Sequence, residues 1–372
     1  MNRGFRILAL LALVSLVAAA CGSKPSNSGS SGSGSANSKF LACQVTDTGG
    51  IDDRSFNATA WKGMQDAQSQ LGVQVKYLES QSANDYTPNL QTFVQQKCGL
   101  IVTVGFLLGD ATKASAASNA NQKYAIVDFA YDPALSNVLG LTFSTDQAAF
   151  MAGYLAAGMS KSHKLGTFGG QKLPTVTIFM DGFWAGMKYY NKQNNAKVEL
   201  IGWNPAKQTG LFTGDFENQD NGKRVTETLL SQGADIILPV AGPVGLGAAA
   251  AVKAAGGDKR MVWVDTDGCE SAQQYCSLFL TSIEKKMDVA VQTAVKSAVD
   301  NSFKGGTYVG TLANDGVGIA PFHDFESQVP QKLKDDLNTI KQGIVFDALQ
   351  MLADVRRMVE DAKRNAPMKA AP

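Results

Sequence analysis

The sequence predicts an α/β protein built from two lobes, each a doubly wound and mostly parallel sheet. From about residue 39 onward, short β-type runs alternate with helical segments, which is the pattern of repeated strand–helix–strand units. Two runs, residues 100–104 and 125–127, are almost entirely apolar, as expected of strands buried on both faces. The alternation starts again after residue 144, and a chain of 372 residues is long enough for two such units.

The first twenty residues have the pattern of a secretory signal. Arg3 and Arg6 precede an apolar run that ends in three alanines before Cys21 and is shorter than the about 20 residues of a membrane span. Small residues directly before a cysteine resemble a bacterial lipobox, which implies cleavage before Cys21 and diacylglycerol on its sulfur. The alternative is an ordinary signal peptide with a coincidental cysteine. Residues 22–38 have the composition of a flexible tether, so we expect the folded part to begin near Lys39.

The charge balance and the cysteines narrow the function classes. The formal net charge is +1, and no basic excess indicates a nucleic-acid partner. Four cysteines remain after Cys21. Two enclose a short loop and two lie in or just before strands expected to be neighbours, so we expect the disulfides Cys43–Cys98 and Cys269–Cys276, although four cysteines allow three connectivities.

No metal ion is expected in this protein. The chain has no CxxC pair, and its two histidines, His163 and His323, are not at ligand spacing. Each histidine is therefore interpreted as a surface residue rather than as a ligand or a base.

The elements of the two lobes follow from the periodicity in chain order. In the first lobe we expect strands at residues 40–46, 73–78, 100–104, 124–128 and 138–142, and helices at 55–71, 86–96 and 111–121. In the second we expect helices at 146–159, 175–192, 221–232 and 245–255, and strands at 164–168, 197–203, 236–240 and 261–265. A strand at 277–282, a helix at 286–303 and a Gly-rich run at 305–318 follow.

Each lobe is expected to contain two separate segments of the chain. We assign residues 39–143 and about 277–312 to the N-terminal lobe, and residues 144–268 and about 313–345 to the C-terminal lobe. Residues 346–372 are expected to form a helical extension that packs on the surface. Its apolar residues recur at helical spacing, but its charges are mixed in sign, which argues against a membrane contact.

The connections between the lobes are expected to form a hinge of several crossings. They are expected near residues 141–146, 267–277 and 310–318, because each of these segments joins elements assigned to different lobes.

Polar residues gather where the first expected strand ends. Asp47, Asp52 and Asp53 flank a Gly-Gly pair there, at the strand end where open α/β sheets bind ligands. The cluster is too sparse for a calcium loop, and an acid–base pair would need separated environments that a sequence does not reveal. As a binding site, Asp47 would accept hydrogen bonds from sugar hydroxyls while Asp52 or Asp53 caps the next helix; the alternative is that all three are turn and cap residues. Phe56 is interpreted either as a ring that stacks on a flat ligand or as a hydrophobic staple.

Several motifs in a fixed order carry a resemblance to a known family. They are DTGGIDDRSFN at 47–57, VGF at 104–106, VDF at 127–129, FMAG at 150–153, DGFWAG at 181–186, AGPVGLG at 241–247, VDTD at 264–267 and TSIEK at 281–285. Together they resemble the basic membrane protein family of bacterial lipoproteins over about residues 39–345. The resemblance implies a type I periplasmic-binding-protein-like fold and a non-enzymatic, monomeric solute-binding protein of an ABC importer. It would be held by lipid on the outer face of the cytoplasmic membrane, bind purine nucleosides without a cofactor, and pass them to a permease.

The resemblance also implies roles for individual residues. Phe56 would stack on the nucleobase, with Asp47 close to the ligand and Asp128 reading the base. The ribose hydroxyls would be held by Asp265 or Asp267, by Lys285 and by the Gly242 turn. A second aromatic residue is expected where this chain has Leu238, so Phe183 or Trp184 would have to supply that ring.

The residues themselves support these roles in part. Asp128, the Gly242 turn and residues 265–267 fall at the carboxyl ends of expected strands and would converge on one edge, with a turn residue as the alternative for Asp267. Lys285 has the alternative of a solvated helix residue. The Gly-rich run at 241–247 lacks the Lys-Ser/Thr ending of a phosphate-binding loop.

Two other functions remain open at this point. One is an extracytoplasmic nucleosidase that uses Asp47 and Asp52, although no Ser/His/Asp or Cys/His arrangement is apparent. The other is a signalling receptor of the same fold that binds a sugar or another small solute.

Overall fold

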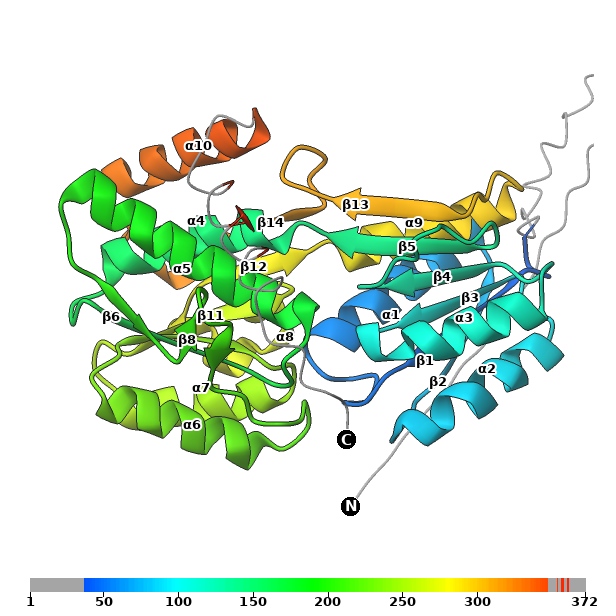
Figure 1. Ribbon diagram of the computed structural model, residues 1–372, viewed down its shortest axis with the longest axis horizontal. Helices are drawn as coiled ribbons and strands as arrows, with labels where there is room; N and C mark the ends of the chain where they lie inside the picture. Colours follow the sequence, from blue (N-terminus) through cyan, green and yellow to red (C-terminus); the bar gives the residue numbers. More distant parts are fainter. Residues whose placement is uncertain (1–36, 347–352, 354–355, 358–359, 361–372) are drawn as a thin grey trace, which may run out of the picture. The chain divides into compact units, whose positions relative to one another are not determined.

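Two six-stranded sheets organise the protein (Figure 1). The computed structural model describes residues 37–346, 353, 356, 357 and 360, and both sheets belong to one compact unit. Cys21, the expected signal segment, nearly all of the tether and most of the expected C-terminal extension lie outside the described residues.

The first sheet has the strand order β13-β5-β4-β3-β1-β2, and all its pairs are parallel. Its strands are β1 (Leu41–Thr46), β2 (Gln74–Leu78), β3 (Leu100–Val104), β4 (Tyr124–Val127), β5 (Val138–Phe143) and β13 (Gly306–Gly310). Helices α1 (Phe56–Leu71) and α9 (Met287–Val299) cover one face, and α2 (Tyr86–Gln95) and α3 (Gly109–Ser118) cover the other (Figure 1). Because both faces are covered, every residue of β3 and β4 is buried, as the apolar runs predict.

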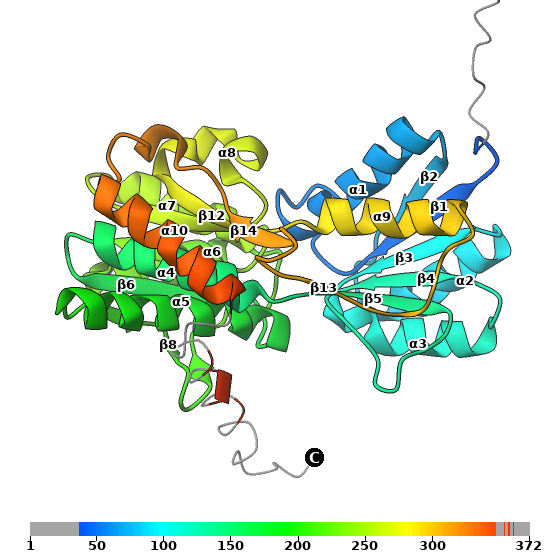
Figure 2. The same ribbon diagram turned by 90° about the horizontal axis from the view of Figure 1, so that it is seen from above.

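The second sheet repeats this arrangement with the order β14-β12-β11-β10-β6-β7. Its strands are β6 (Lys164–Gly169), β7 (Glu199–Ile201), β10 (Ile236–Val240), β11 (Arg260–Asp265), β12 (Phe279–Lys285) and β14 (Val317–Ile319), of which β14 is antiparallel to β12. Its helices are α4 (Thr145–Met159) and α5 (Pro174–Asn194) on one face and α6 (Gln219–Ser231) and α7 (Val244–Ala255) on the other. Helix α10 (Gln331–Val345) lies against α4 (Figure 2).

The assignment of residues 277–285 to the first lobe is wrong. They end in strand β12, which pairs with β11 inside the second sheet. The chain therefore crosses to the first sheet only at Lys286, where α9 begins and packs on α1, and not between residues 267 and 277. The other two crossings, between β5 and α4 and between β13 and β14, lie within the expected segments (Figure 2).

The expected strand at 197–203 is interrupted. It divides into β7 and the short β8 (Trp203–Asn204), which pairs with β9 (Thr209–Gly210). Gly202 between them has φ 90°, and a Cβ there would lie 1.9 Å from the carbonyl oxygen of Thr167. The backbone therefore turns at Gly202, where only glycine fits.

Both expected disulfides are present in the structure. Cys43–Cys98 joins β1 to the segment before β3, and Cys269–Cys276 closes a loop between β11 and β12. Within the described part of the chain, no helix combines the length and the apolar character needed to cross a membrane.

The contact between α4 and α5 yields a first testable prediction. A Cβ on Gly153 of α4 would lie 2.0 Å from the carbonyl oxygen of Phe183 on α5, a backbone atom that cannot move alone. We expect Gly153→Ala to lower the free energy of unfolding by about 1–3 kcal/mol, even though alanine is the better helix former. Urea unfolding followed by circular dichroism measures this.

Gly158 in the same helix is the matched control. A Cβ there would meet only side-chain atoms, 2.9 Å from the methyl groups of Leu333 and 3.1 Å from the ring of Tyr190. Gly158→Ala should therefore change the stability much less. Equal losses in the two variants would contradict the close approach of the two helices at Gly153.

Candidate functional site

Six of the nine residues expected to bind a ligand line one cavity. They are Asp47, Phe56, Asp128, Gly242, Asp265 and Lys285. The empty space among the lining residues is about 560 Å³, open solvent at the mouth of the cavity included. Its walls come from strand ends of both sheets, as expected of ligand sites in open α/β sheets.

Lys285 is the centre of the polar wall. Its Nζ lies 2.7 Å from Asp128 Oδ2 and 3.1 Å from Asp265 Oδ1, and its side chain is only 3% exposed. Because Asp128 follows β4 of the first sheet and Asp265 ends β11 of the second, this ammonium group connects the two sheets. The same Nζ lies 4.5 Å from the ring centre of Phe56 and 5.4 Å from that of Phe179, so the cation also contacts two aromatic faces.

The charge states of this group follow from burial and pairing. Burial alone would lower the pKa of Lys285, but the carboxylates of Asp128 and Asp265 outweigh it, so the pKa of Lys285 is raised and the ammonium form is held. Burial raises the pKa of Asp128, and Lys285 limits that rise.

Asp128 and Asp265 occupy equivalent places in the two sheets. Each stands at the carboxyl end of the strand that is fourth in chain order within its sheet, β4 in the first sheet and β11 in the second. Both have left-handed backbones, with φ 64° and 73°. Aspartate tolerates this conformation better than most residues, and such backbones are concentrated at functional sites. The turn at each strand end thus aims one carboxyl group into the cavity.

Asp53 and Asp52 differ in their surroundings. Asp53 is buried, and its carboxylate accepts backbone N–H bonds from Ser55, Asn57 and Ala58 at 2.8–3.0 Å, so Asp53 caps the start of α1. Burial raises the pKa of Asp53 to about 7, a rise that the three N–H donors oppose. Asp52 is exposed and pairs with Arg54 at 3.1 Å.

Asp47 is also a buried carboxyl group of the cavity wall. Its carboxyl group covers Gly105, where a Cβ would lie 2.0 Å from Asp47 Oδ2, so only glycine fits under it. Burial raises the pKa of Asp47 well above its ordinary value; Asn57 opposes the rise through a hydrogen bond, and the charges of Asp53 and Asp128 add to it. Among the described residues, no cation lies within ion-pair distance of Asp47.

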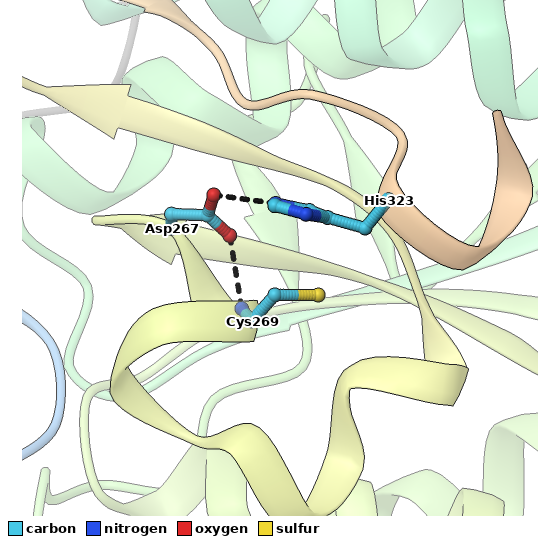
Figure 3. A group of neighbouring side chains, drawn as sticks. All are labelled: Asp267, Cys269 and His323. Carbon is cyan, nitrogen blue, oxygen red and sulfur yellow. Dashed lines mark hydrogen bonds and ion pairs between the residues drawn. The ribbon is translucent and has the colours of Figure 1, made fainter.

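The other three expected residues do not line this cavity. Asp267 starts the short helix α8 (Gly268–Ser271), where one carboxylate oxygen accepts the N–H of Cys269 at 2.9 Å and the other lies 2.6 Å from His323 Nε2 (Figure 3). Phe183 is fully buried in the core between α4 and α5. Trp184 contacts Lys188, whose Nζ lies 5.9 Å from the ring centre.

Three aromatic residues that line the cavity are absent from the sequence-based set. Phe106 directly follows β3 and Gly105, so the rule that placed Asp128 at a strand end would also have found it. Phe179 lies on α5 one helical turn before Phe183, and Phe216 lies in an irregular segment before α6. No periodicity marks Phe216.

Asp267, Cys269 and His323 form a cluster whose ligand atoms lie within 4.8 Å of one another. Cys269 is bonded to Cys276, so its sulfur is not a thiolate and the cluster lacks the ligand that zinc prefers. This geometry supports a helix cap with a histidine partner rather than a metal site (Figure 3).

Comparison with known proteins shows the family of this chain. The family model described as ABC transporter substrate-binding protein PnrA-like matches residues 40–350. The chain belongs to this family. It is 31% identical over 305 residues to the ABC transporter nucleoside-binding protein BmpA of Lactococcus lactis, covering 77% of this chain and 83% of the relative. It is 30% identical over 317 residues to basic membrane protein A of Borreliella burgdorferi, covering 84% and 88%.

The fold of this PnrA-like protein has solved counterparts. A crystal structure of an ABC transporter solute-binding protein from Aeropyrum pernix superimposes with a TM-score of 0.69 at 27% identity, covering 87% of this chain and 90% of that one. The resemblance to the basic membrane protein family and the two-sheet α/β fold expected from the sequence are thereby confirmed.

Proposed function

We propose that this PnrA-like protein binds a nucleoside, purine in preference to pyrimidine, in the cavity between its two sheets and passes it to the permease of an ABC importer. The observation that carries the proposal is the pairing of aromatic rings with buried carboxylates around one lysine in a single cavity. A nucleoside presents the matching groups, a flat base and a ribose with hydroxyl donors. The relative in Lactococcus lactis is named a nucleoside-binding protein, which supports the same ligand class.

The rings divide between the two sides of the cavity. Phe56 begins α1 on the first sheet, whereas Phe179 and Phe216 belong to segments of the second. A base inserted between Phe56 and Phe216 would be stacked from both lobes, and Phe216 would take the role for which the sequence suggested Phe183 or Trp184. Asp128 would accept a hydrogen bond from the base.

The ribose would lie at the polar wall. Carboxylate oxygens of Asp265 accept hydroxyl protons, and the Lys285 ammonium donates to hydroxyl oxygens. Gly242, with φ 52°, brings the backbone close to this region without a side chain. Asp267 is left outside the ligand contacts because its carboxylate is used by Cys269 and His323.

Closure of the two lobes over the ligand requires no covalent chemistry. Ser55 Oγ donates to Asp265 Oδ2 at 2.9 Å, and the Gly49 N–H donates to Glu217 Oε1 at 3.0 Å, so groups on the first sheet already reach the second. Contacts that the ligand makes to both lobes at once would favour the closed form, with motion at the three chain crossings. We further propose a monomer that is held on the outer face of the cytoplasmic membrane by lipid on Cys21.

Calorimetric titration of the purified protein with adenosine, guanosine, inosine, uridine, ribose and arabinose tests the proposal. We expect saturable binding of purine nucleosides, weaker binding of uridine and none of the free sugars. A ligand at a hundred times its Kd should also raise the free energy of unfolding by about 2.7 kcal/mol in a thermal-shift assay.

Two results would overturn the proposal. One is stabilisation by a sugar and by no nucleoside, which would favour a receptor for another solute. The other is release of free base at catalytic rates when inosine is incubated with the protein, which would favour a nucleosidase.

A further inference from the structure

The cavity holds more carboxyl groups than its cations can balance. Asp47, Asp53, Asp128 and Asp265 all line it, and Lys285 is the one lysine among the lining residues. Buried charges are costly unless each has an opposite charge or hydrogen-bond donors. Asp128 and Asp265 share Lys285, and Asp53 accepts three backbone N–H bonds, so these three have partners for an ionised form.

Asp47 has fewer such partners, because only the Asn57 side chain acts on it through a hydrogen bond and no lysine or arginine of the described residues lies within ion-pair distance. The side chains that act on it from the neighbouring elements are Asn57 of α1, Asp53 before α1, Asp128 after β4 and Tyr86 of α2. Two of these are themselves carboxyls, whereas the Asn57 amide and the Tyr86 hydroxyl group can donate, and none of the four carries a positive charge. Asp47 Oδ2 occupies the place where a Cβ of residue 105 would stand, so the glycine at that position leaves room for this carboxyl group.

We propose that Asp47 carries its proton at neutral pH and donates a hydrogen bond to an acceptor atom of the ligand's base, a ring nitrogen or a carbonyl oxygen. The proposal rests on the proposed function in taking a nucleoside as the ligand. It gives two carboxyl groups that line the cavity together with Phe56 opposite tasks. Asp47 is the donor, and Asp128, kept ionised by Lys285, is the acceptor. The cavity would then select bases that present an acceptor and a donor at these two places.

The direction of the pH dependence follows from the raised pKa of Asp47. The neutral form persists above the pKa of an exposed aspartate, which is about 3.9, and is lost only when the pH rises through the folded-state value. Because the ligand would bind the protonated form, its affinity should be constant below that value and fall above it by about tenfold per pH unit.

The protonation state can be measured without any ligand. Carbon-13 NMR of the full protein labelled at aspartate carboxyl groups, titrated from mildly acidic to alkaline pH, would assign the Asp47 signal by its loss in Asp47→Asn. We expect a carboxylic-acid chemical shift at neutral pH that changes to that of a carboxylate only at higher pH. A carboxylate shift at neutral pH overturns the proposal, whatever the protein binds.

The donor role is tested by calorimetry with adenosine and inosine, of which adenosine does not titrate in this range. Asp47→Asn is isosteric and retains an N–H donor, so we expect its neutral-pH affinity to stay within about threefold of wild type and its alkaline loss to disappear. Asp52→Asn, in the same segment but exposed and paired with Arg54, is the control and should keep the wild-type profile.

Two outcomes of this titration count against the donor role. One is a loss of more than about tenfold at neutral pH in Asp47→Asn, which would mean that Asp47 acts as an acceptor. The other is an alkaline loss that persists in that variant, which would mean that a group other than Asp47 titrates. If neither nucleoside binds to any variant, the proposed function fails and the donor role fails with it. The NMR titration still decides whether Asp47 is protonated.

Discussion

Replacing Lys285 with methionine is expected to lower the free energy of unfolding by about 3–5 kcal/mol at neutral pH, because removing one partner of a buried ion pair leaves unpaired charge in the interior. Lys285 lies within ion-pair distance of both Asp128 and Asp265, all three side chains being less than a tenth exposed. Methionine has a similar length and no charge, so the loss reports on the ammonium group rather than on volume. Urea unfolding of the two proteins measures the difference.

Lys286 offers a control one residue away. Its side chain is 40% exposed and pairs with Glu284 at 2.8 Å, so Lys286→Met should cost less than about 1 kcal/mol. Similar losses in the two variants would contradict the assignment of Lys285 as the structural centre of the cavity.

The sign of the pH dependence gives a second check on Lys285. In Lys285→Met, Asp128 can avoid its buried charge by taking up a proton, so the pKa of Asp128, already raised by burial, should rise further. A raised carboxyl pKa destabilises the folded state above the unfolded-state value of about 3.9, and not below it. The deficit of the variant should therefore shrink as the pH falls toward that value, and a deficit independent of pH would indicate a packing defect.

The sequence predicts the type and order of nearly all the elements but not the sheet that each strand joins. Residues 100–104 and 125–127 are recognisable as buried parallel strands from their apolar composition alone. Strand β12 has equally good strand character, yet nothing in its own residues says that its neighbour is β11 rather than a strand of the first sheet. The sequence therefore places the crossing one strand too early, because strand pairing is a long-range property.

The sequence also predicts some residues of the candidate site and not others. Residues at strand ends, such as Asp47, Asp128 and Asp265, follow from the rule that parallel strands present their carboxyl ends at one edge. Asp267 stands two residues past the end of β11, where the chain has already turned into α8, and it caps that helix instead. On α5 the cavity meets Phe179 and not Phe183, because the rotation of a helix against its neighbours is set by packing, here by the close approach at Gly153.

Phe56→Ala is expected to weaken nucleoside binding by about 1–3 kcal/mol, or roughly 5- to 150-fold in Kd, which is the range for removing an aromatic ring that stacks on a base. The ring of Phe56 lines the cavity and lies 4.5 Å from the Lys285 ammonium group. Its loss would remove a stacking face and a cation–π contact from the same site. Calorimetry with adenosine measures the change, and circular dichroism verifies that the fold is retained.

Two further variants separate stacking from simple burial. Phe56→Leu keeps an apolar side chain of moderate size without a ring, so it should lose most of the affinity that Phe56→Ala loses if stacking is the source. Trp184→Ala removes a larger ring that does not line the cavity and should leave Kd unchanged within about twofold, apart from any general loss of stability. Wild-type affinity in Phe56→Leu would mean that Phe56 only packs and does not stack on the base. A large loss of affinity in Trp184→Ala would mean that Trp184 of α5 is the second stacking residue. If Phe216 is the second stacking residue, as proposed, Phe216→Ala should weaken nucleoside binding and Trp184→Ala should not.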